Sequence, residues 1–360
     1  MKKLNLAIIG QGRSGKDIHG VYYNSERNKY YNVKYVVDMD EFRRGVAEKI
    51  YPGCQTFASY QELFDKKDID LVVNSTYSEM HYPITKDLLS HGFNVLVEKP
   101  FARNQFECED LIKTAKDNGV LLAVFQNTFF APYYLHVLKL LEEQKFGKVE
   151  QISIRFNNFA RRWDWQTLQC KLAGNVYNTG PHPIGLALGF LGFDDGAKVV
   201  YSKLANTTLS SGDSDDYAKI LIEAPNKPLI DLEINSTDAF SAYNIKIQSD
   251  KGTFKCTPRK YEWKYIIDGE NEPRPLIRES LKDADGNPIY CGENKIVHEE
   301  TGEYKETAFD AGTAGVYEEV YYALTEGKPL TISAEKVTKI VGVMEMVHAQ
   351  NPLPVKFNSN

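Results

Sequence analysis

The sequence has few cysteines and no long apolar run. The five cysteines of the 360-residue chain are scattered, and none forms a Cys-x-x-Cys pair or a metal-type spacing with histidine. This pattern is typical of reduced thiols, so we expect a cytoplasmic protein with no metal site. No apolar stretch approaches the roughly 20 residues that span a membrane. The short run after Lys2 and Lys3 ends at Gly10-Gln11-Gly12, which argues against a signal peptide.

The chain also lacks an excess of positive charge. Its 43 lysines and arginines are outnumbered by 49 aspartates and glutamates, and the net charge is −6. No basic cluster is dense enough to form a nucleic-acid surface, so the balance favours a small-molecule partner. A hydrophobic content of 42% is ordinary, and 360 residues suit two domains better than one core.

The first 125 residues alternate between strand-like and helix-like patterns. Ser59 and Glu62 have the spacing of a capping box, and Asn104 opens a helix that Gly119 closes. The expected strands lie at residues 4–9, 33–37, 54–57, 71–73, 94–97 and 120–125. Such alternation predicts an α/β domain over residues 1–125, with a parallel sheet covered by helices on both faces.

The pattern changes after residue 125. Expected strands lie at 149–156, 198–204, 217–223, 229–234, 244–248 and 253–256, and expected helices at about 131–145, 180–191, 310–326 and 333–349. Residues 268–308 are polar and turn-rich, and we expect loops there. Strands that follow one another through turns predict a largely antiparallel sheet, so residues 126–360 read as an α+β domain.

A glycine-rich turn follows the first expected strand and opens a helix. Gly10, Gly12 and Gly15 have the Gly-x-Gly-x-x-Gly spacing that lets the backbone approach a pyrophosphate at a helix N-terminus. Asp38 ends the second strand, where a carboxylate accepts hydrogen bonds from both ribose hydroxyls and repels a 2′-phosphate. The sequence therefore predicts NAD, while arginines at positions 13, 43 and 44 leave NADP open.

Further polar residues are expected near the same cofactor because they follow strand ends. The predicted cofactor contacts beyond the glycines and Asp38 are Gln11, Arg13, Ser14, Ser75, Thr76, Tyr77, His81, Glu98, Lys99 and Gln126. The alternative for Ser75 to Tyr77 is a simple helix entry, and a lone histidine such as His81 is more often a surface or capping residue.

Several short motifs, in their order, resemble the Gfo/Idh/MocA family of oxidoreductases over nearly the whole chain. They are GQGRSG at residues 10–15, Ser75-Thr76-x4-His81, Glu98-Lys99-Pro100 and Asn178-Thr179-Gly180-Pro181-His182. The run Ile18-His19-Gly20 resembles the scyllo-inositol dehydrogenase branch. The resemblance implies a Rossmann domain, then a substrate-binding domain whose open mixed sheet often serves oligomerisation. We therefore expect a homodimer or homotetramer formed through that sheet.

The resemblance also implies catalytic roles. Lys99 matches the family lysine that contacts substrate and nicotinamide, and the family Asp-x-x-x-His pair falls on Asn178 and His182. The chain departs from the family because Asn178 replaces the usual aspartate, and Gly185 stands where many members carry another.

Oxidation of a secondary alcohol requires a base for the hydroxyl proton. We expect His182 to be that base and Lys99 to stabilise the developing alkoxide. Asn178 can orient a sugar hydroxyl but cannot stabilise an imidazolium by charge. Either His182 is then a weaker base than in relatives that carry the aspartate, or Lys99 carries more of the proton chemistry.

An aromatic and charged run, Arg161 to Trp165, precedes that histidine. Indole faces stack on sugar rings, so Arg161, Trp163 and Trp165 are candidate substrate contacts; the alternative is a core or oligomer contact. Weaker candidates for the same pocket are Asn127, Lys171 and Tyr177. The helical spacing of Tyr317, Tyr321 and Tyr322 predicts packing instead.

The leading interpretation is an NAD(P)-dependent dehydrogenase or reductase that acts on CH–OH groups of a cyclic polyol, sugar or sugar derivative. One alternative is a glycoside-processing enzyme that oxidises its substrate transiently. Another is a non-catalytic, cofactor-binding regulator of the same fold.

Overall fold

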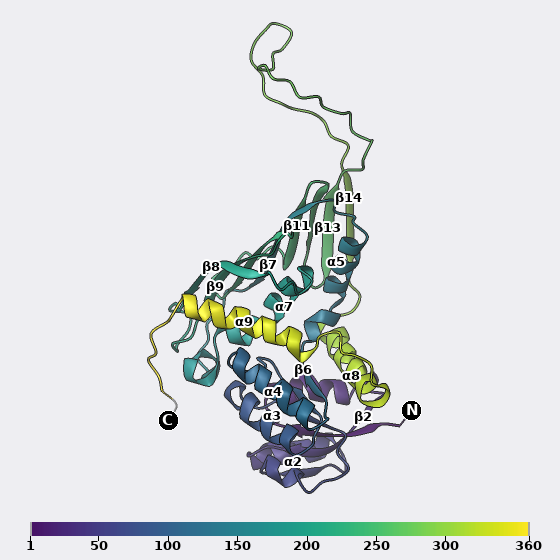
Figure 1. Cartoon of the computed structure of the whole chain (residues 1–360), viewed down its shortest axis with the longest axis vertical. Helices are drawn as coiled ribbons and strands as arrows, with labels where there is room; N and C mark the ends of the chain where they lie inside the picture. Colours follow the sequence, from purple (N-terminus) through teal and green to yellow (C-terminus); the bar gives the residue numbers. More distant parts are fainter. Residues whose placement is uncertain (1, 359–360) are drawn as a thin grey trace.

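The computed structural model describes residues 2–358, which form two sheets flanked by helices (Figure 1). In the first sheet, parallel strands are arranged in the order β3-β2-β1-β4-β5-β6. Its strands are β1 (Leu4–Ile9), β2 (Tyr31–Val37), β3 (Gln55–Phe57), β4 (Leu71–Asn74), β5 (Val95–Val97) and β6 (Leu122–Val124). Its helices are α1 (Gly20–Tyr23), α2 (Glu41–Ile50), α3 (His81–Ser90) and α4 (Gln105–Asp117).

Both faces of this sheet are apolar, as the sequence predicts. Alternate residues of β1 enter different cores: Ala7 and Ile9 join one cluster, whereas Leu6 and Ile8 join the other. Helix α8 (Ala308–Glu326) packs into the second cluster through Tyr317 and Tyr321, so these tyrosines do serve packing. The chain therefore returns to the first sheet near its end (Figure 1).

The second sheet has the order β14-β13-β12-β11-β7-β10-β9-β8 and is antiparallel except between β7 and β10. Its strands are β7 (Val149–Asn157), β8 (Lys198–Ala205), β9 (Tyr217–Glu223), β10 (Leu229–Asn235), β11 (Ile245–Ser249), β12 (Gly252–Cys256), β13 (Lys260–Tyr265) and β14 (His298–Glu303). The remaining helices are α5 (Pro132–Glu142), α6 (Asn175–Asn178), α7 (Pro181–Phe190) and α9 (Ala334–Gln350).

Two strands of this sheet escape the sequence prediction. Strand β13 lies beyond the last expected strand, and β14 lies inside residues 268–308, which were expected to be loops. The β14 sequence, HEETGE, has no apolar alternation, so only its pairing with β13 makes it a strand. Between the two strands, residues 266–297 leave the sheet as a long projection (Figure 1).

The two faces of the second sheet differ in polarity. Ile152 and Ile154 of β7 are fully buried in the same cluster as α7 residues. The opposite side of the same strands carries ion pairs: Arg155 and Lys219 both bind Asp231, whose side chain is 15% exposed. This sheet is thus covered on one face and charged on the other.

Negative findings apply to residues 2–358. None of the helices in that range is long and apolar enough to cross a membrane. That range also contains no group of three or more His, Cys, Asp or Glu side chains that would hold a metal ion. All five cysteines are free thiols.

Candidate active site

The glycine-rich turn lies between β1 and a π-helix, η1 (Arg13–His19), and its three glycines serve different purposes. Gly10 has φ +90°, and a Cβ there would lie 2.7 Å from the Ser75 carbonyl oxygen. A Cβ on Gly15 would lie 1.9 Å from the Gly10 oxygen. A Cβ on Gly12 would meet its nearest described neighbour, the Arg43 guanidinium, at 3.9 Å. The turn is thus closed by Gly10 and Gly15 and open at Gly12, where a pyrophosphate fits.

Asp38 is fixed beside this turn. Its Oδ2 accepts from the Gln11 backbone N–H at 2.7 Å, and its Oδ1 accepts from that of Asp40 at 2.9 Å. The remaining carboxylate lone pairs suit ribose hydroxyls, as the sequence predicts for NAD. Arg43 lies 3.7 Å from the same carboxylate and is half-exposed, so a cation is also available there for a 2′-phosphate.

Ser75 supports the turn from the next strand. Its hydroxyl lies 2.9 Å from the carbonyl oxygens of Ile9 and Gly10. Thr76 is turned inward as well, because its hydroxyl donates to the Asn74 side chain at 2.7 Å. Both predicted cofactor contacts therefore bind neighbouring protein groups: Ser75 supports the glycine-rich turn, and Thr76 binds the Asn74 side chain.

His81 is buried and occupied on both ring nitrogens. Nδ1 lies 2.7 Å from the Pro100 carbonyl oxygen, and Nε2 lies 3.2 Å from that of Thr76. Burial lowers the pKa of His81. The residue ties α3 to the Lys99-Pro100 segment and is buried, not a surface residue, whereas its predicted cofactor contact stays a prediction.

Lys99 joins the two halves of the molecule. It follows β5, and its ammonium donates to the Asn178 carbonyl oxygen at the end of α6, at 2.8 Å. Burial lowers the pKa of Lys99, the Glu98 carboxylate opposes that shift, and Arg13 and Arg162 add to it. The site therefore holds three neighbouring cations from three separate segments.

Glu98 points into the protein behind Lys99. Its Oε2 accepts from the Lys99 backbone N–H at 2.9 Å, and its Oε1 lies 3.2 Å from His19 Nε2. Burial would raise the pKa of Glu98, but His19, Lys99 and His81 hold it at about 2. The contacts of Glu98 are thus to protein groups, although the sequence predicts a cofactor contact.

His182 lies in the first turn of α7, close to Lys99. Its Nδ1 is 3.4 Å from the Thr128 hydroxyl, at the long limit of a hydrogen bond. Burial and the Lys99 charge lower the pKa of His182 to about 3, so the ring is neutral at physiological pH.

The Asn178 side chain is turned away from this pair. Its Nδ2 donates to the Gln166 carbonyl oxygen at 3.0 Å, and its buried Oδ1 has no hydrogen-bond partner among residues 2–358. The group of residue 178 that contacts Lys99 is the backbone carbonyl. A carbonyl is present whatever the side chain, so the change from aspartate leaves this anchor intact.

The predicted substrate residues fall into two groups. Trp165 packs edge-on against Tyr77 with ring centroids 4.9 Å apart, and Lys171 pairs with Glu79 at 2.8 Å. Both contacts bridge the segment after β4 to the second half of the chain, as the contact alternative for Trp165 proposes. Trp163 is 77% exposed and is free to contact a ligand.

Tyr177 and Arg161 lie apart from this pairing. The Tyr177 ring stacks on His348 at 4.6 Å, and its hydroxyl donates to the Arg103 carbonyl oxygen at 3.2 Å. Arg161 is exposed. Tyr177 therefore packs against α9.

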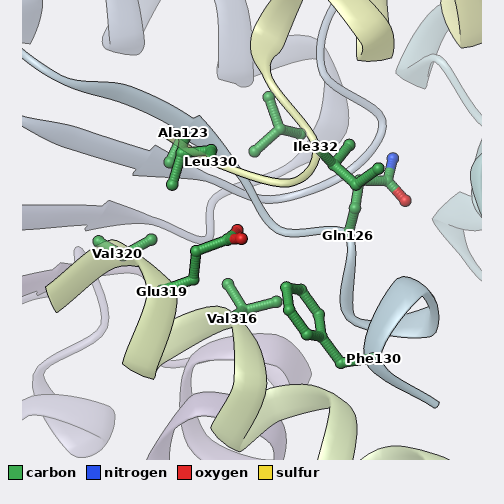
Figure 2. A pocket seen from close by; sticks show the side chains of 9 residues that line it. Ala123, Gln126, Phe130, Val316, Glu319, Val320, Leu330 and Ile332 are labelled. Carbon is green, nitrogen blue, oxygen red and sulfur yellow. The ribbon is translucent and has the colours of Figure 1, made fainter. Parts of the chain in front are cut away.

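Gln126 and Asn127 follow β6; Gln126 is buried and Asn127 is partly buried. Neither amide atom of Gln126, nor Asn127 Oδ1, has a hydrogen-bond partner in the described part of the chain. Gln126 borders a cavity of about 10 Å³, room for one water molecule at most. Figure 2 shows Glu319 of α8 directed into the middle of this cavity's lining, with the Gln126 amide turned away from it. The unpaired amide atoms fit a role in holding a ligand.

Sequence reasoning gave no site role to three residues near the site, and it named a fourth, Arg162, only as part of the run Arg161 to Trp165. Thr128 contacts His182, Arg162 adds positive charge near Lys99, and His19 and Tyr317 lie behind Glu98. Arg162 had a signal, since it adjoins Arg161 in the same motif. Contacts across about 300 residues of chain, such as that of Tyr317 with His19, leave no local pattern.

Comparison with known proteins agrees with this geometry. Residues 4–126 match the family model described as "Oxidoreductase family, NAD-binding Rossmann fold", and residues 134–255 match the GFO/IDH/MocA C-terminal domain. Together the two models match well over half of the chain.

Three similar proteins illustrate the range of relatives. The scyllo-inositol 2-dehydrogenase (NADP(+)) IolW of Bacillus subtilis is 22% identical over 95% of this chain and 92% of its own. The 2,7-anhydro-N-acetylneuraminate hydratase of Mediterraneibacter gnavus is 22% identical over 81% and 77%. The structure of the WlbA dehydrogenase from Bordetella pertussis, in complex with NADH and UDP-GlcNAcA, has a TM-score of 0.75 at 17% identity and covers 97% and 95%.

The glycine-rich turn, the Asp38 carboxylate beside it and the two matching models lead to one conclusion. The chain belongs to the Gfo/Idh/MocA family of oxidoreductases and has an NAD-binding Rossmann domain.

Proposed function

We propose that this protein transfers a hydride between a nicotinamide cofactor and a secondary alcohol or ketone of a cyclic polyol, sugar or sugar derivative. The observation that carries the proposal is the contact between the Lys99 ammonium and the Asn178 carbonyl oxygen at 2.8 Å. It brings the end of a dinucleotide-binding sheet against the helices of the second half. When bound, the nicotinamide supplies the hydride acceptor or donor.

Within this site, Lys99 is our candidate for the proton chemistry. Its burial favours the uncharged amine, so it exchanges a proton more readily than an exposed lysine. His182, neutral with a pKa of about 3, is a weak base and suits hydrogen bonding to a substrate hydroxyl. This arrangement favours the interpretation in which Lys99 carries more of the proton chemistry because Asn178 replaces the usual aspartate.

The substrate class rests on the segment around Arg162, whose charge acts on Lys99, and on Asn178. Trp163 offers an exposed aromatic face, Arg162 and Asp164 form an ion pair at 2.7 Å beside it, and the Asn178 Oδ1 is unpaired among the described residues. An aromatic face with mixed polar groups suits a polyhydroxylated ring. The named activities of IolW and WlbA agree with such a substrate.

The test is formation of NADH or NADPH by the purified protein over a panel of inositols, sugars and sugar derivatives. We expect turnover on at least one neutral cyclic polyol or sugar. Cofactor binding without turnover on any member would contradict the proposal and favour a regulator.

A second candidate is redox-neutral processing of a glycoside, in which the same cofactor is oxidised and reduced within one cycle. The observation that favours it is the similarity to a relative named as an anhydro-sugar hydratase. Conversion of an anhydro-sugar or glycoside without net NADH, detected by mass spectrometry of the products, would select this candidate.

We also infer a cytoplasmic homo-oligomer. The free cysteines agree with a reducing compartment. The charged face of the second sheet, on which Arg155 is 13% exposed and Asp231 15%, offers a flat surface of alternating charge for a second copy. Light scattering at increasing salt is the test, since an interface of ion pairs weakens as salt screens it.

A further inference from the structure

A buried chain of polar groups connects Lys99 to helix α8. His19, the last residue of the π-helix, is fully buried, with Nε2 3.2 Å from Glu98 Oε1 and Nδ1 2.9 Å from the Tyr317 hydroxyl. Tyr317 is also fully buried, and the Tyr23 hydroxyl donates to its hydroxyl. This series of polar contacts therefore runs from Tyr23 through Tyr317 and His19 to Glu98, which precedes Lys99.

One direction of donation along these contacts places a proton on the side of His19 that faces Glu98. With Tyr23 as donor to Tyr317, the hydroxyl proton of Tyr317 is available for His19 Nδ1. An imidazole that accepts at Nδ1 carries its proton on Nε2, which is the nitrogen facing Glu98. Those two atoms complete no hydrogen bond of normal geometry with any described residue, so the attraction between them is that of a charge and a dipole 3.2 Å apart.

Glu98 depends on this support because it is only 3% exposed. A buried carboxylate is stable as an anion only when donors or cations face it, and otherwise it takes up a proton. The groups that face Glu98 are His19, the Lys99 backbone N–H and, at longer range, the Lys99 and His81 side chains. If Glu98 became neutral, Lys99 would lose the anion that stabilises its ammonium.

We propose that His19, oriented by Tyr317, is a positioning residue that keeps Glu98 ionised and thereby sets the proton affinity of Lys99. The inference rests on the proposed function only where it assigns the Lys99 proton a role in catalysis. The buried contacts exist whatever the substrate is.

The experiment measures the proton affinity of Lys99 directly. The full-length, cofactor-free protein is labelled with acetic anhydride at a series of pH values, and the labelling of Lys99 is followed by mass spectrometry. Lys99 is partly exposed, and the midpoint of its labelling against pH, not the extent of labelling, reports its proton affinity. The test variants are His19→Leu and Tyr317→Phe, and Glu98→Gln is the reference for loss of the anion.

The chain offers a matched control in Tyr22. Its ring stacks on Tyr317 with centroids 4.6 Å apart, and its buried hydroxyl has no hydrogen-bond partner within residues 2–358. Tyr22→Phe therefore removes a hydroxyl from the same cluster of tyrosines and leaves the polar contacts between Tyr23, Tyr317, His19 and Glu98 unchanged.

We expect the labelling midpoint of Lys99 to fall by about one pH unit in His19→Leu, Tyr317→Phe and Glu98→Gln, a tenfold loss of proton affinity. Tyr22→Phe should keep the wild-type midpoint. In the active enzyme, the pH profile of kcat should move in the same direction while KM for the substrate stays constant.

An unchanged midpoint in Tyr317→Phe would overturn the proposal when Glu98→Gln shifts it. An equal shift in Tyr22→Phe would also overturn it. Tyr317→Phe retains the ring and its stacking, so it remains informative if His19→Leu does not fold. The labelling needs no substrate, and a failure to find turnover, which would count against the proposed function, leaves this result intact.

Discussion

The two halves of the site differ in charge, although both lie in buried surroundings. The first sheet contributes ionised groups, Lys99 and Glu98, and the second half contributes neutral ones, the Asn178 carbonyl and His182. The difference follows from their partners. Glu98 has His19 and a backbone N–H beside it, whereas His182 has a hydroxyl at 3.4 Å. A buried group keeps its charge where the fold supplies partners and loses it elsewhere.

Among the changes that test this difference between the two halves, removal of Lys99 should have the largest effect on kcat. In the proposed function, Lys99 holds the substrate oxygen and moves its proton, so we expect kcat of Lys99→Met to fall by about 10³-fold. Steady-state kinetics measures the loss, and cofactor affinity by fluorescence should change little. Lys86→Met, at an exposed ion pair with Asp110, is the matched control. A loss of less than tenfold at Lys99 would contradict its role.

Asp38 tests the predicted cofactor preference of the first sheet. The sequence predicts that its carboxylate accepts from ribose and repels a 2′-phosphate, and Asp38→Asn replaces that carboxylate with a neutral amide whose one oxygen remains to accept from Gln11 or Asp40. We expect the ratio of NADP to NAD affinity to rise about tenfold or more. Titration calorimetry with both cofactors measures it. Asp40→Asn is the control, because Asp40 caps α2 and is exposed. An unchanged ratio of NADP to NAD affinity would mean that Asp38 does not distinguish a free ribose 2′-hydroxyl from a 2′-phosphate.

The sequence predicted the first half of this site better than the second. The turn at Gly10 to Gly15, Asp38 and Lys99 follow from local spacing at the ends of buried strands, and the structure places them together. The fold of the first sheet follows from the same alternation of apolar runs. The fold prediction is confirmed because the information is local, and the cofactor and catalytic roles of these residues stay predictions.

The second half depends on contacts between distant segments. Strand β14 is charged and exposed, so its pattern favours a loop until β13 pairs with it. The inward position of His81, the pairing of Trp165 with Tyr77, and the environment that neutralises His182 also arise from tertiary packing. Side-chain identity alone does not determine which of several partners such residues meet.

Substitution of His182 should lower kcat less than substitution of Lys99, because the His182 ring is neutral at every pH of the assay. His182→Gln keeps a hydrogen-bonding side chain and removes the titrating ring, so we expect kcat to fall by about tenfold or less. The pH profile of kcat between about pH 5 and pH 9 should keep its shape, because a group with a pKa near 3 does not titrate there. A loss of 10³-fold together with a vanished acidic limb would identify His182 as the base instead.

The smallest effects concern stability against pH, and they separate the two halves in one titration. The pKa of His182 is about 3 in the folded chain and 6.5 ordinarily, so below pH 6.5 the unfolded chain binds a proton that the folded chain does not. Stability is then lost as pH falls from 6.5 toward 3. The pKa of Glu98 is about 2 in the folded chain and 4.5 ordinarily. The stability that Glu98 contributes is therefore lost only as pH falls below 4.5.

Urea unfolding at stepped pH values compares the free energy of unfolding of each variant with that of the wild type. His182→Gln should lose less stability than the wild type between pH 6.5 and 4.5, and Glu98→Gln should follow the wild type in that window and diverge below it. Differences between variant and wild type cancel the titration of other histidines, such as His348, whose pKa is raised by Asp215 despite burial. Coincident curves for His182→Gln and the wild type would show that the pKa of His182 is the same in the folded and the unfolded chain, and the contrast between the two halves would then fail.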